Sequence, residues 1–108
     1  MEFSNIQKRA IDVRERYATL EKSKNATEWT RADLVRGFVG DVGDLVKLTM
    51  AEDGVRTIAD SKAKLSHELA DCLWSIVVIA EKYGVDLETS FLHTMDELEQ
   101  RIKTDLEK

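Results

Sequence analysis

A chain of 108 residues with a formal net charge of −5 is long enough for one domain with a modest core and leaves little room for a second. Its 16 basic residues form no dense cluster, which argues against nucleic-acid binding, and no apolar run is long enough to predict a membrane span. The single cysteine, Cys72, excludes an internal disulfide and is typical of a protein from a reducing compartment. We therefore expect one cytoplasmic domain over residues 1–108, with neither a nucleic-acid nor a membrane partner.

The chain reads as helical from end to end. Apolar residues recur at three- and four-residue steps and proline is absent, which predicts an all-α fold. The first predicted helix carries an apolar stripe from Phe3 to Leu20. Asn25 or Thr30 is expected to cap a second helix, which ends near Gly54, where glycine permits a left-handed turn.

Two further helices are predicted in the second half of the chain. Asp60 or Ser61 is expected to cap the third helix, which ends at Gly84, and Asp86 to cap the fourth. The predicted apolar seam of the third helix consists of Leu65, Leu69, Cys72, Ile76, Ile79 and Tyr83. The fourth helix is predicted to face inward through Leu87, Phe91, Met95, Leu98, Ile102 and Leu106. Four helices with short loops predict a four-helix bundle, whose core we expect oligomerisation to complete.

Two acidic pairs interrupt these apolar runs. Asp41 and Asp44 stand in Val-Gly-Asp-Val-Gly-Asp-Leu, and Glu68 and Asp71 in Ser-His-Glu-Leu-Ala-Asp-Cys-Leu-Trp. The i, i+3 spacing puts both carboxylates of a pair on one helix face, about 5–6 Å apart at Cβ. Carboxylates beside a core seam are costly unless a cation neutralises them, and four converging oxygen donors suit Mg²⁺. The alternative is an ordinary solvated acidic face, because 34% of the chain is charged.

Three glycines lie in the helix of the first acidic pair, at Gly37, Gly40 and Gly43. Each costs on the order of 1 kcal/mol relative to alanine inside a helix. Close approach of a neighbouring helix or of a ligand is the expected compensation, because glycine has no side chain that would hold either away.

The two acidic motifs resemble those of MazG-like nucleoside triphosphate pyrophosphohydrolases. Val-Gly-Asp-Val-Gly-Asp-Leu at 39–45 is similar to the family's Val-Gly-Glu-Val-Gly-Glu-Leu, and Glu-Leu-Ala-Asp-Cys-Leu-Trp at 68–74 is similar to its Glu-Leu-x-Asp-Val-Leu. The segments at 29–34 and 83–87 also match family segments in order and spacing. The resemblance therefore covers roughly residues 27–102.

The resemblance implies an all-α, dimeric or tetrameric enzyme that uses Mg²⁺ to cleave a nucleoside triphosphate, commonly a deoxynucleotide, to the monophosphate and pyrophosphate. Carried over by position, its metal ligands are Asp41, Asp44, Glu68 and Asp71. Asp41 is expected to orient the attacking water. Trp29 is expected to stack on the base, and Trp74 to line the pocket or pack in the core. Arg101 resembles part of the basic, asparagine-containing segment that follows the last motif in the dCTP-pyrophosphatase-like branch, and it is expected to bind substrate.

Two alternatives stay open, because Asp41 and Asp44 replace family glutamates and are each one methylene shorter. One is a catalytically weak or inactive relative that binds nucleotide or metal. The other is a helical oligomeric interaction module whose acids serve solubility. The resemblance also leaves the nucleobase open, although Gly40 stands where the dimeric dUTPase branch has a glutamate, which disfavours that branch.

Overall fold

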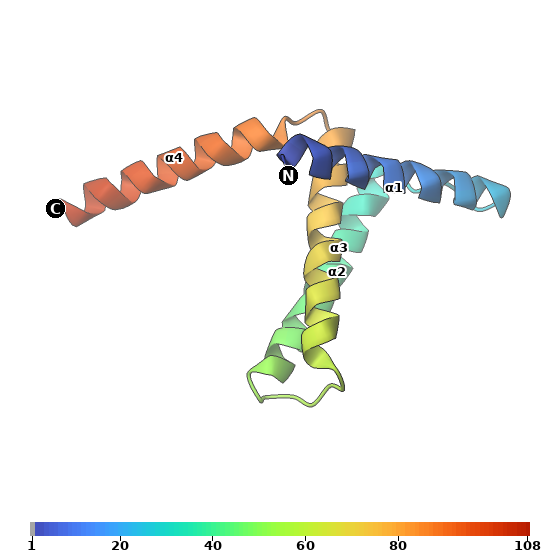
Figure 1. The fold of residues 1–108 in the computed structure, drawn as a ribbon, viewed down its shortest axis with the longest axis horizontal. Coiled ribbons are helices and arrows are strands. Elements are labelled where there is room, and N and C mark those ends of the chain that lie inside the picture. Colours follow the sequence, from blue (N-terminus) through green and yellow to red (C-terminus); the bar gives the residue numbers. More distant parts are fainter. Residues whose placement is uncertain (1) are drawn as a thin grey trace.

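The computed structural model describes residues 2–108 and folds this range into four α-helices without a strand. They are α1 (Phe3–Ser23), α2 (Arg31–Glu52), α3 (Ser61–Lys82) and α4 (Leu87–Leu106) (Figure 1). The predicted all-α fold is confirmed. Over the described residues, no helix combines the length and apolar character needed to cross a membrane.

Side-chain caps fix the beginnings of α2 and α4. Thr30 Oγ1 accepts a hydrogen bond from the Asp33 N–H at 3.1 Å, and the Asp33 carboxylate accepts one from the Thr30 N–H at 3.0 Å. This reciprocal capping box satisfies two backbone donors at once. Asp86 caps α4 by accepting from the N–H of Thr89 at 3.1 Å. Thr30 and Asp86 are therefore confirmed as caps.

Residues with positive φ lie in the loops between the helices. Gly54 (φ 78°) and Gly84 (φ 69°) follow α2 and α3 in the left-handed conformation that was predicted for glycine there. Asn25 has φ 57° in the loop after α1, so the alternative in which it caps the second helix is wrong. Asp60 precedes α3 with φ 54°, but its side chain makes no capping hydrogen bond.

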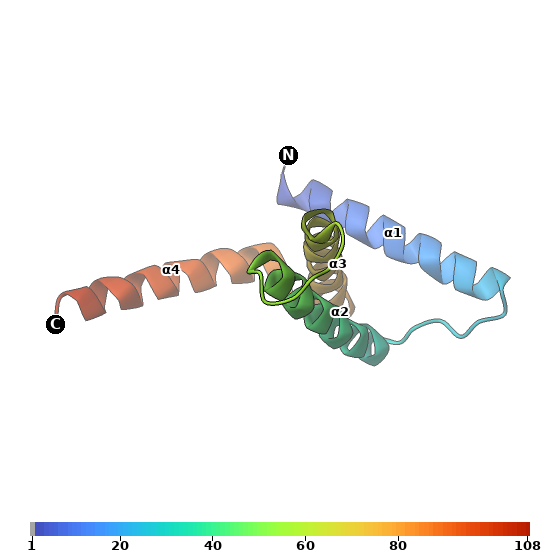
Figure 2. The ribbon, with the colours of Figure 1, turned by 90° about the horizontal axis from the view of Figure 1, so that it is seen from below.

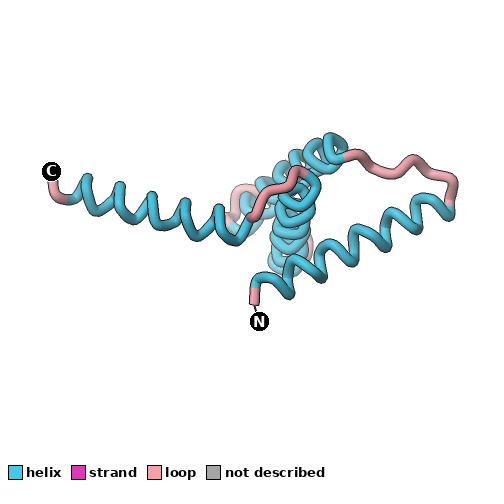
Figure 3. The backbone as a smooth tube through the Cα atoms, turned by 90° about the horizontal axis from the view of Figure 1, so that it is seen from above, coloured by secondary structure: helices cyan, strands magenta, loops and turns pink. Residues whose placement is uncertain are grey.

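The helices form an open arrangement rather than a closed bundle within one chain. α2 and α3 pack along each other as an antiparallel hairpin, and α1 packs across α3 (Figures 1 and 2). A long loop returns the chain from the end of α1 to the start of α2 (Figure 3). α4 extends away from the other helices, so the radius of gyration is 17.5 Å, whereas a compact domain of this length has about 13 Å.

The core of the single chain is small and centred on α3. Val77 and Val78 are each 2% exposed and form a cluster with Ala10 of α1. Half-buried apolar side chains close this cluster, namely Phe3, Leu34, Trp74 and Leu87. Trp74 is fixed in it, because its indole N–H donates to the carbonyl of Ala10 at 2.9 Å. Arg31 of α2 stacks on the ring of Tyr83, 4.3 Å from its centre, and ties the two ends of the hairpin together.

The predicted seam of α3 is only partly right. Cys72 is buried, but Leu69, Ile76 and Tyr83 are each at least 40% exposed. The most deeply buried residues, Val77 and Val78, lie outside that seam. A single seam assumes one partner helix, whereas α3 contacts both α1 and α2 and so buries a wider sector of its surface.

Most of the stripe predicted to face inward on α4 is exposed in the described chain. Leu87 packs on the core, whereas the exposed fractions of Phe91, Leu98, Ile102 and Leu106 are 57%, 40%, 59% and 81%. The inward orientation is therefore wrong for the single chain, because α4 leaves the hairpin instead of folding back onto it.

Candidate functional site

Three carboxylates converge between the two helices of the hairpin. Asp41 and Asp44 of α2 and Glu68 of α3 each offer an oxygen atom, and these oxygens lie within 4.8 Å of one another. Asp41 and Glu68 are half-buried, and Asp44 is exposed. One helical turn separates Asp41 from Asp44, so both reach the same side of α2. The structure thus brings together three of the predicted metal ligands.

The environment of Glu68 fits a bound cation. Its Oε1 atom is buried and accepts no hydrogen bond from the described residues. Burial raises the pKa of the Glu68 carboxyl, and the negative charges of Asp41, Asp71 and Asp44 raise this pKa further. A cation would neutralise this charge and occupy the unpaired oxygen. Because the donors are all carboxylate oxygens, the cluster suits a hard divalent ion such as Mg²⁺.

Asp71 lies outside this cluster. Its Oδ2 atom is 3.2 Å from Nε2 of His67, one turn earlier on α3. Asp71 is nevertheless near enough for its charge to raise the pKa of Glu68. This pairing went unnoticed in the sequence, although the i, i+4 spacing of His67 and Asp71 is the pattern that predicts it.

A cavity of about 470 Å³ lies beside the carboxylates, with walls from α1, α2 and α3. We call it the aromatic cavity, because Trp29, Trp74 and Tyr17 line it together with Asp41 and Asp71. The rings of Tyr17 and Trp74 lie 5.7 Å apart and are tilted by 38°. The structure therefore places both tryptophans that the sequence singled out next to two of the predicted metal ligands.

Trp29 approaches α2 closely at a glycine. A Cβ atom on Gly37 would lie 2.7 Å from Cζ3 of the Trp29 ring, closer than such atoms can approach. Gly37 thus has a close contact, but with a side chain of the loop before α2 and not with the neighbouring helix or the ligand that the glycine pattern predicts. Gly40 and Gly43 have open space instead, since within the described chain no atom lies within 4 Å of a Cβ built there.

A second cavity, of about 460 Å³, lies nearer the loop between α2 and α3. We call it the lysine cavity, because Lys47 and Lys64 line it with Asp44 and Glu68. Neither lysine was recognised from the sequence. The signal was present, because Lys47 follows Asp44 by three residues and Lys64 precedes Glu68 by four, and both spacings predict a shared helix face.

Arg101 is not brought to the carboxylates within one chain. It lies on the exposed outer part of α4, and α4 points away from the hairpin (Figure 1). The structure of the single chain therefore does not bring Arg101 together with the other predicted site residues.

Comparison with known proteins identifies the family. A profile of the MazG nucleotide pyrophosphohydrolase domain matches residues 33–105. The chain belongs to the MazG family. Its membership indicates nucleotide pyrophosphohydrolase activity, and MazG enzymes generally use a divalent metal ion. The matched segment contains all three converging carboxylates and excludes α1 and Trp29. The chain matches no curated protein and no solved structure.

Proposed function

We propose that this MazG protein is a Mg²⁺-dependent pyrophosphohydrolase that converts a nucleoside triphosphate, preferably a deoxynucleotide, to the monophosphate and pyrophosphate. The observation that carries the proposal is the convergence of Asp41, Asp44 and Glu68 within 4.8 Å, with one Glu68 oxygen buried and unpaired. Mg²⁺ held by these carboxylates would neutralise phosphate oxygens and the negative charge that develops on them during hydrolysis.

The lining of the two cavities suggests where the base and the phosphates of the substrate bind. Trp29 and Trp74 offer ring faces for the base in the aromatic cavity. Lys47 and Lys64 offer ammonium groups for the outer phosphates in the lysine cavity. The α-phosphate would then lie beside the carboxylates, between the cavities, which agrees with cleavage between the α and β phosphates.

Asp41 is our candidate for orienting the attacking water. It is the one member of the carboxylate cluster that also lines the aromatic cavity. A carboxylate has two oxygens, so one can bind the cation while the other accepts a hydrogen bond from water. We keep Asp71 as a fourth ligand, because its contact with His67 is between partly exposed side chains and such pairs are weak.

We further propose that the enzyme is a cytoplasmic homodimer or homotetramer. The apolar stripe of α4 supports this assembly, because it is largely exposed in the single chain. Arg101 lies on the same helix and would contact substrate in a neighbouring subunit.

The test is a panel of common and damaged nucleoside triphosphates, ribo and deoxy, incubated with the protein in Mg²⁺ or in EDTA. We expect Mg²⁺-dependent release of pyrophosphate and monophosphate in equal amounts. Asp41→Asn should lower turnover by about 100-fold or more, because it removes an acceptor that positions water, while the matched variant Asp12→Asn on the exposed face of α1 should not. Release of orthophosphate in place of pyrophosphate, or no turnover of any nucleotide, would contradict the proposal.

A second candidate is a relative that binds nucleotide without cleaving it. It is favoured by the shorter side chains of Asp41 and Asp44, which stand where the family pattern has glutamate. In that case Mg²⁺ and nucleotide raise the melting temperature without pyrophosphate release, since a ligand at 100 times its Kd adds about 2.7 kcal/mol of stability. An interaction module would show neither response.

A further inference from the structure

A partly buried ion pair on α1, formed by Arg14 and Glu21, lines the aromatic cavity. Arg14 is 6% exposed and is the one buried charged residue of the described chain. Its Nη1 and Nη2 atoms each donate to a carboxylate oxygen of Glu21 at 3.3 Å, and both residues line the cavity. Buried ion pairs contribute little net stability, because desolvation offsets their attraction. Net stability alone therefore does not explain why an arginine is buried at this position.

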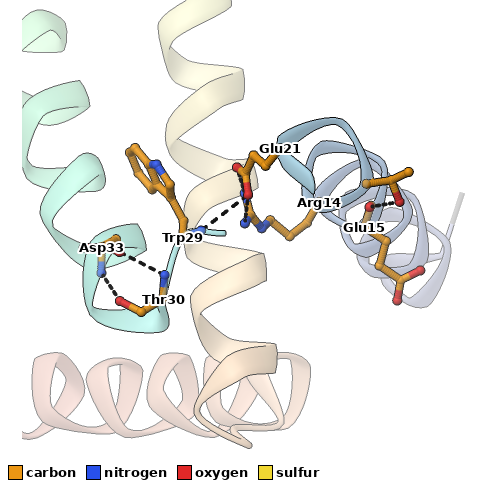
Figure 4. Close-up of polar contacts among 7 residues, drawn as sticks. Arg14, Glu15, Glu21, Trp29, Thr30 and Asp33 are labelled. Atoms are coloured by element: carbon orange, nitrogen blue, oxygen red, sulfur yellow. Dashed lines mark hydrogen bonds and ion pairs between the residues drawn. The ribbon is translucent and has the colours of Figure 1, made fainter. Parts of the chain in front are cut away.

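Glu21 connects this pair to Trp29. Its Oε2 atom also accepts a hydrogen bond from the backbone N–H of Trp29 at 3.4 Å (Figure 4). α1 thus holds the segment whose indole ring rests against Gly37. Both oxygens of Glu21 are engaged, whereas Glu21 uses only two of the five N–H donors of Arg14. The other N–H donors of Arg14 have no partner among the described residues, and Arg14 lines the cavity.

The Arg14–Glu21 pair has no net charge, which favours an uncharged group of the ligand beside it. Glu21 already balances the guanidinium, and the other charged groups at the cavity wall are the carboxylates of Asp41 and Asp71, beside the titratable His67. A phosphate would bind more favourably in the lysine cavity, because two ammonium groups lie there near the carboxylate cluster. The remaining donors of Arg14 suit the neutral edge of a ring that lies against Trp29.

We propose that Arg14 reads the nucleobase: its free N–H groups donate to acceptor atoms on the base edge, while Glu21 holds both the guanidinium and the Trp29 segment in place. A donor-only group selects bases with two adjacent acceptors, which are O6 and N7 of guanine or O2 and N3 of cytosine, over adenine. The inference rests on the proposed function in taking a nucleotide as the ligand. Both residues precede the segment matched to the MazG domain, so family membership does not imply this role.

The test measures binding of dAMP, dCMP, dGMP and dTMP in EDTA by calorimetry, which requires neither turnover nor metal. We expect dGMP or dCMP to bind about tenfold or more tightly than dAMP, the range for hydrogen bonds to a charged group. Arg14→Lys should remove this preference, because it removes the planar fork of donors. Arg16→Lys, on an exposed position of the same helix, should keep it. Glu21→Gln should weaken the preference while retaining a hydrogen-bond acceptor, which provides a second variant if Arg14→Lys does not fold.

The inference is overturned if wild-type protein binds all four monophosphates equally or binds none at millimolar concentration. It is also overturned if Arg14→Lys or Glu21→Gln lowers all four affinities by the same factor, which is the signature of a structural role. The proposed function and the base-reading role are contradicted by different outcomes. Arg14-dependent base preference without pyrophosphate release would contradict only the enzyme, and turnover with an unchanged preference in Arg14→Lys would contradict only the base-reading role.

Discussion

The indole ring of Trp29 occupies the space that a side chain on Gly37 would need. A Cβ on Gly37 would lie 2.7 Å from Cζ3 and 3.1 Å from Cη2 of that ring. Glycine at this position lowers the helix propensity of α2, but it leaves room for the Trp29 ring, which lines the aromatic cavity. The position of Trp29 is set from both sides, since Glu21 of α1 accepts its backbone N–H.

Gly37→Ala is expected to displace the Trp29 ring without unfolding the protein. Alanine improves helix propensity by about 1 kcal/mol, and the atoms in its way belong to a side chain that can rotate. We expect a shift in tryptophan emission and a rise in the nucleotide KM of about tenfold, because a stacked base contributes about 1–3 kcal/mol. Gly43→Ala meets no atom within 4 Å and should leave the emission unchanged. Unchanged emission and KM in Gly37→Ala would remove Trp29 from the base site.

The local features of the fold were predictable from the sequence, because they depend on neighbours in the chain. Thr30, Asp86 and Gly84 have their expected roles, since capping and left-handed turns involve residues within one helical turn. The burial of Val77 and Val78 was not predictable in this way, because it depends on two partner helices for α3.

The candidate site was predictable to a similar extent. The convergence of Asp41, Asp44 and Glu68 followed from motif spacing and resemblance. The Arg14–Glu21 pair was not foreseen, because an arginine next to an apolar stripe gives no sign from spacing alone that α1 will bury it against the cavity.

Glu68→Gln is expected to stabilise the protein when divalent ions are absent. The pKa of Glu68 is raised in the folded state, chiefly by burial, so the folded state binds more protons than the unfolded state between the ordinary and the raised pKa. Stability is then greatest below the ordinary pKa and falls as pH rises through this window. The neutral amide avoids that loss. In EDTA at neutral pH we expect Glu68→Gln to melt a few degrees higher than wild type, at about 4–8 °C per kcal/mol for a domain of this size.

The same pair of proteins tests the metal site. Mg²⁺ should raise the melting temperature of the wild type and leave that of Glu68→Gln unchanged. Glu81→Gln is the matched control, because Glu81 is exposed on the same helix, and it should respond to Mg²⁺ like wild type. A thermal shift with Mg²⁺ that survives in Glu68→Gln would exclude Glu68 as a ligand.

Thr30→Ala is expected to lower the free energy of unfolding by about 1 kcal/mol, the usual cost of losing an N-cap. The hydrogen bond from the Thr30 N–H, together with the Thr30 side chain and Arg36, lowers the pKa of Asp33. The stability that the ionised Asp33 carboxylate contributes is therefore present at neutral pH and is lost as pH falls through the lowered pKa. Urea unfolding at neutral pH measures the loss. Thr49→Ala, an exposed site late in α2, should change stability by less than about 0.5 kcal/mol, and an equal loss in both variants would exclude a special role for the cap.

Ile102→Asp is expected to dissociate the proposed oligomer. Ile102 is 59% exposed on the apolar stripe of α4, and a charge in an interface formed by this stripe would be desolvated without a partner. Light scattering should give wild type a mass of at least twice 12.3 kDa and the variant the mass of one chain. Gln100→Asp, which adds the same charge on the polar side of α4, should remain oligomeric. A wild type that is monomeric at micromolar concentration would contradict the assembly.

The monomeric variant also separates metal binding from turnover. The carboxylate cluster lies within one chain, so Ile102→Asp should retain the thermal shift with Mg²⁺. Arg101 is remote from the cluster of its own chain, so turnover should fall by about tenfold or more if the arginine contacts phosphate in a neighbouring subunit. Arg101→Ala should then lose activity to a similar extent while keeping the oligomeric mass. Full turnover by the Ile102→Asp monomer would instead show that one chain contains the complete site.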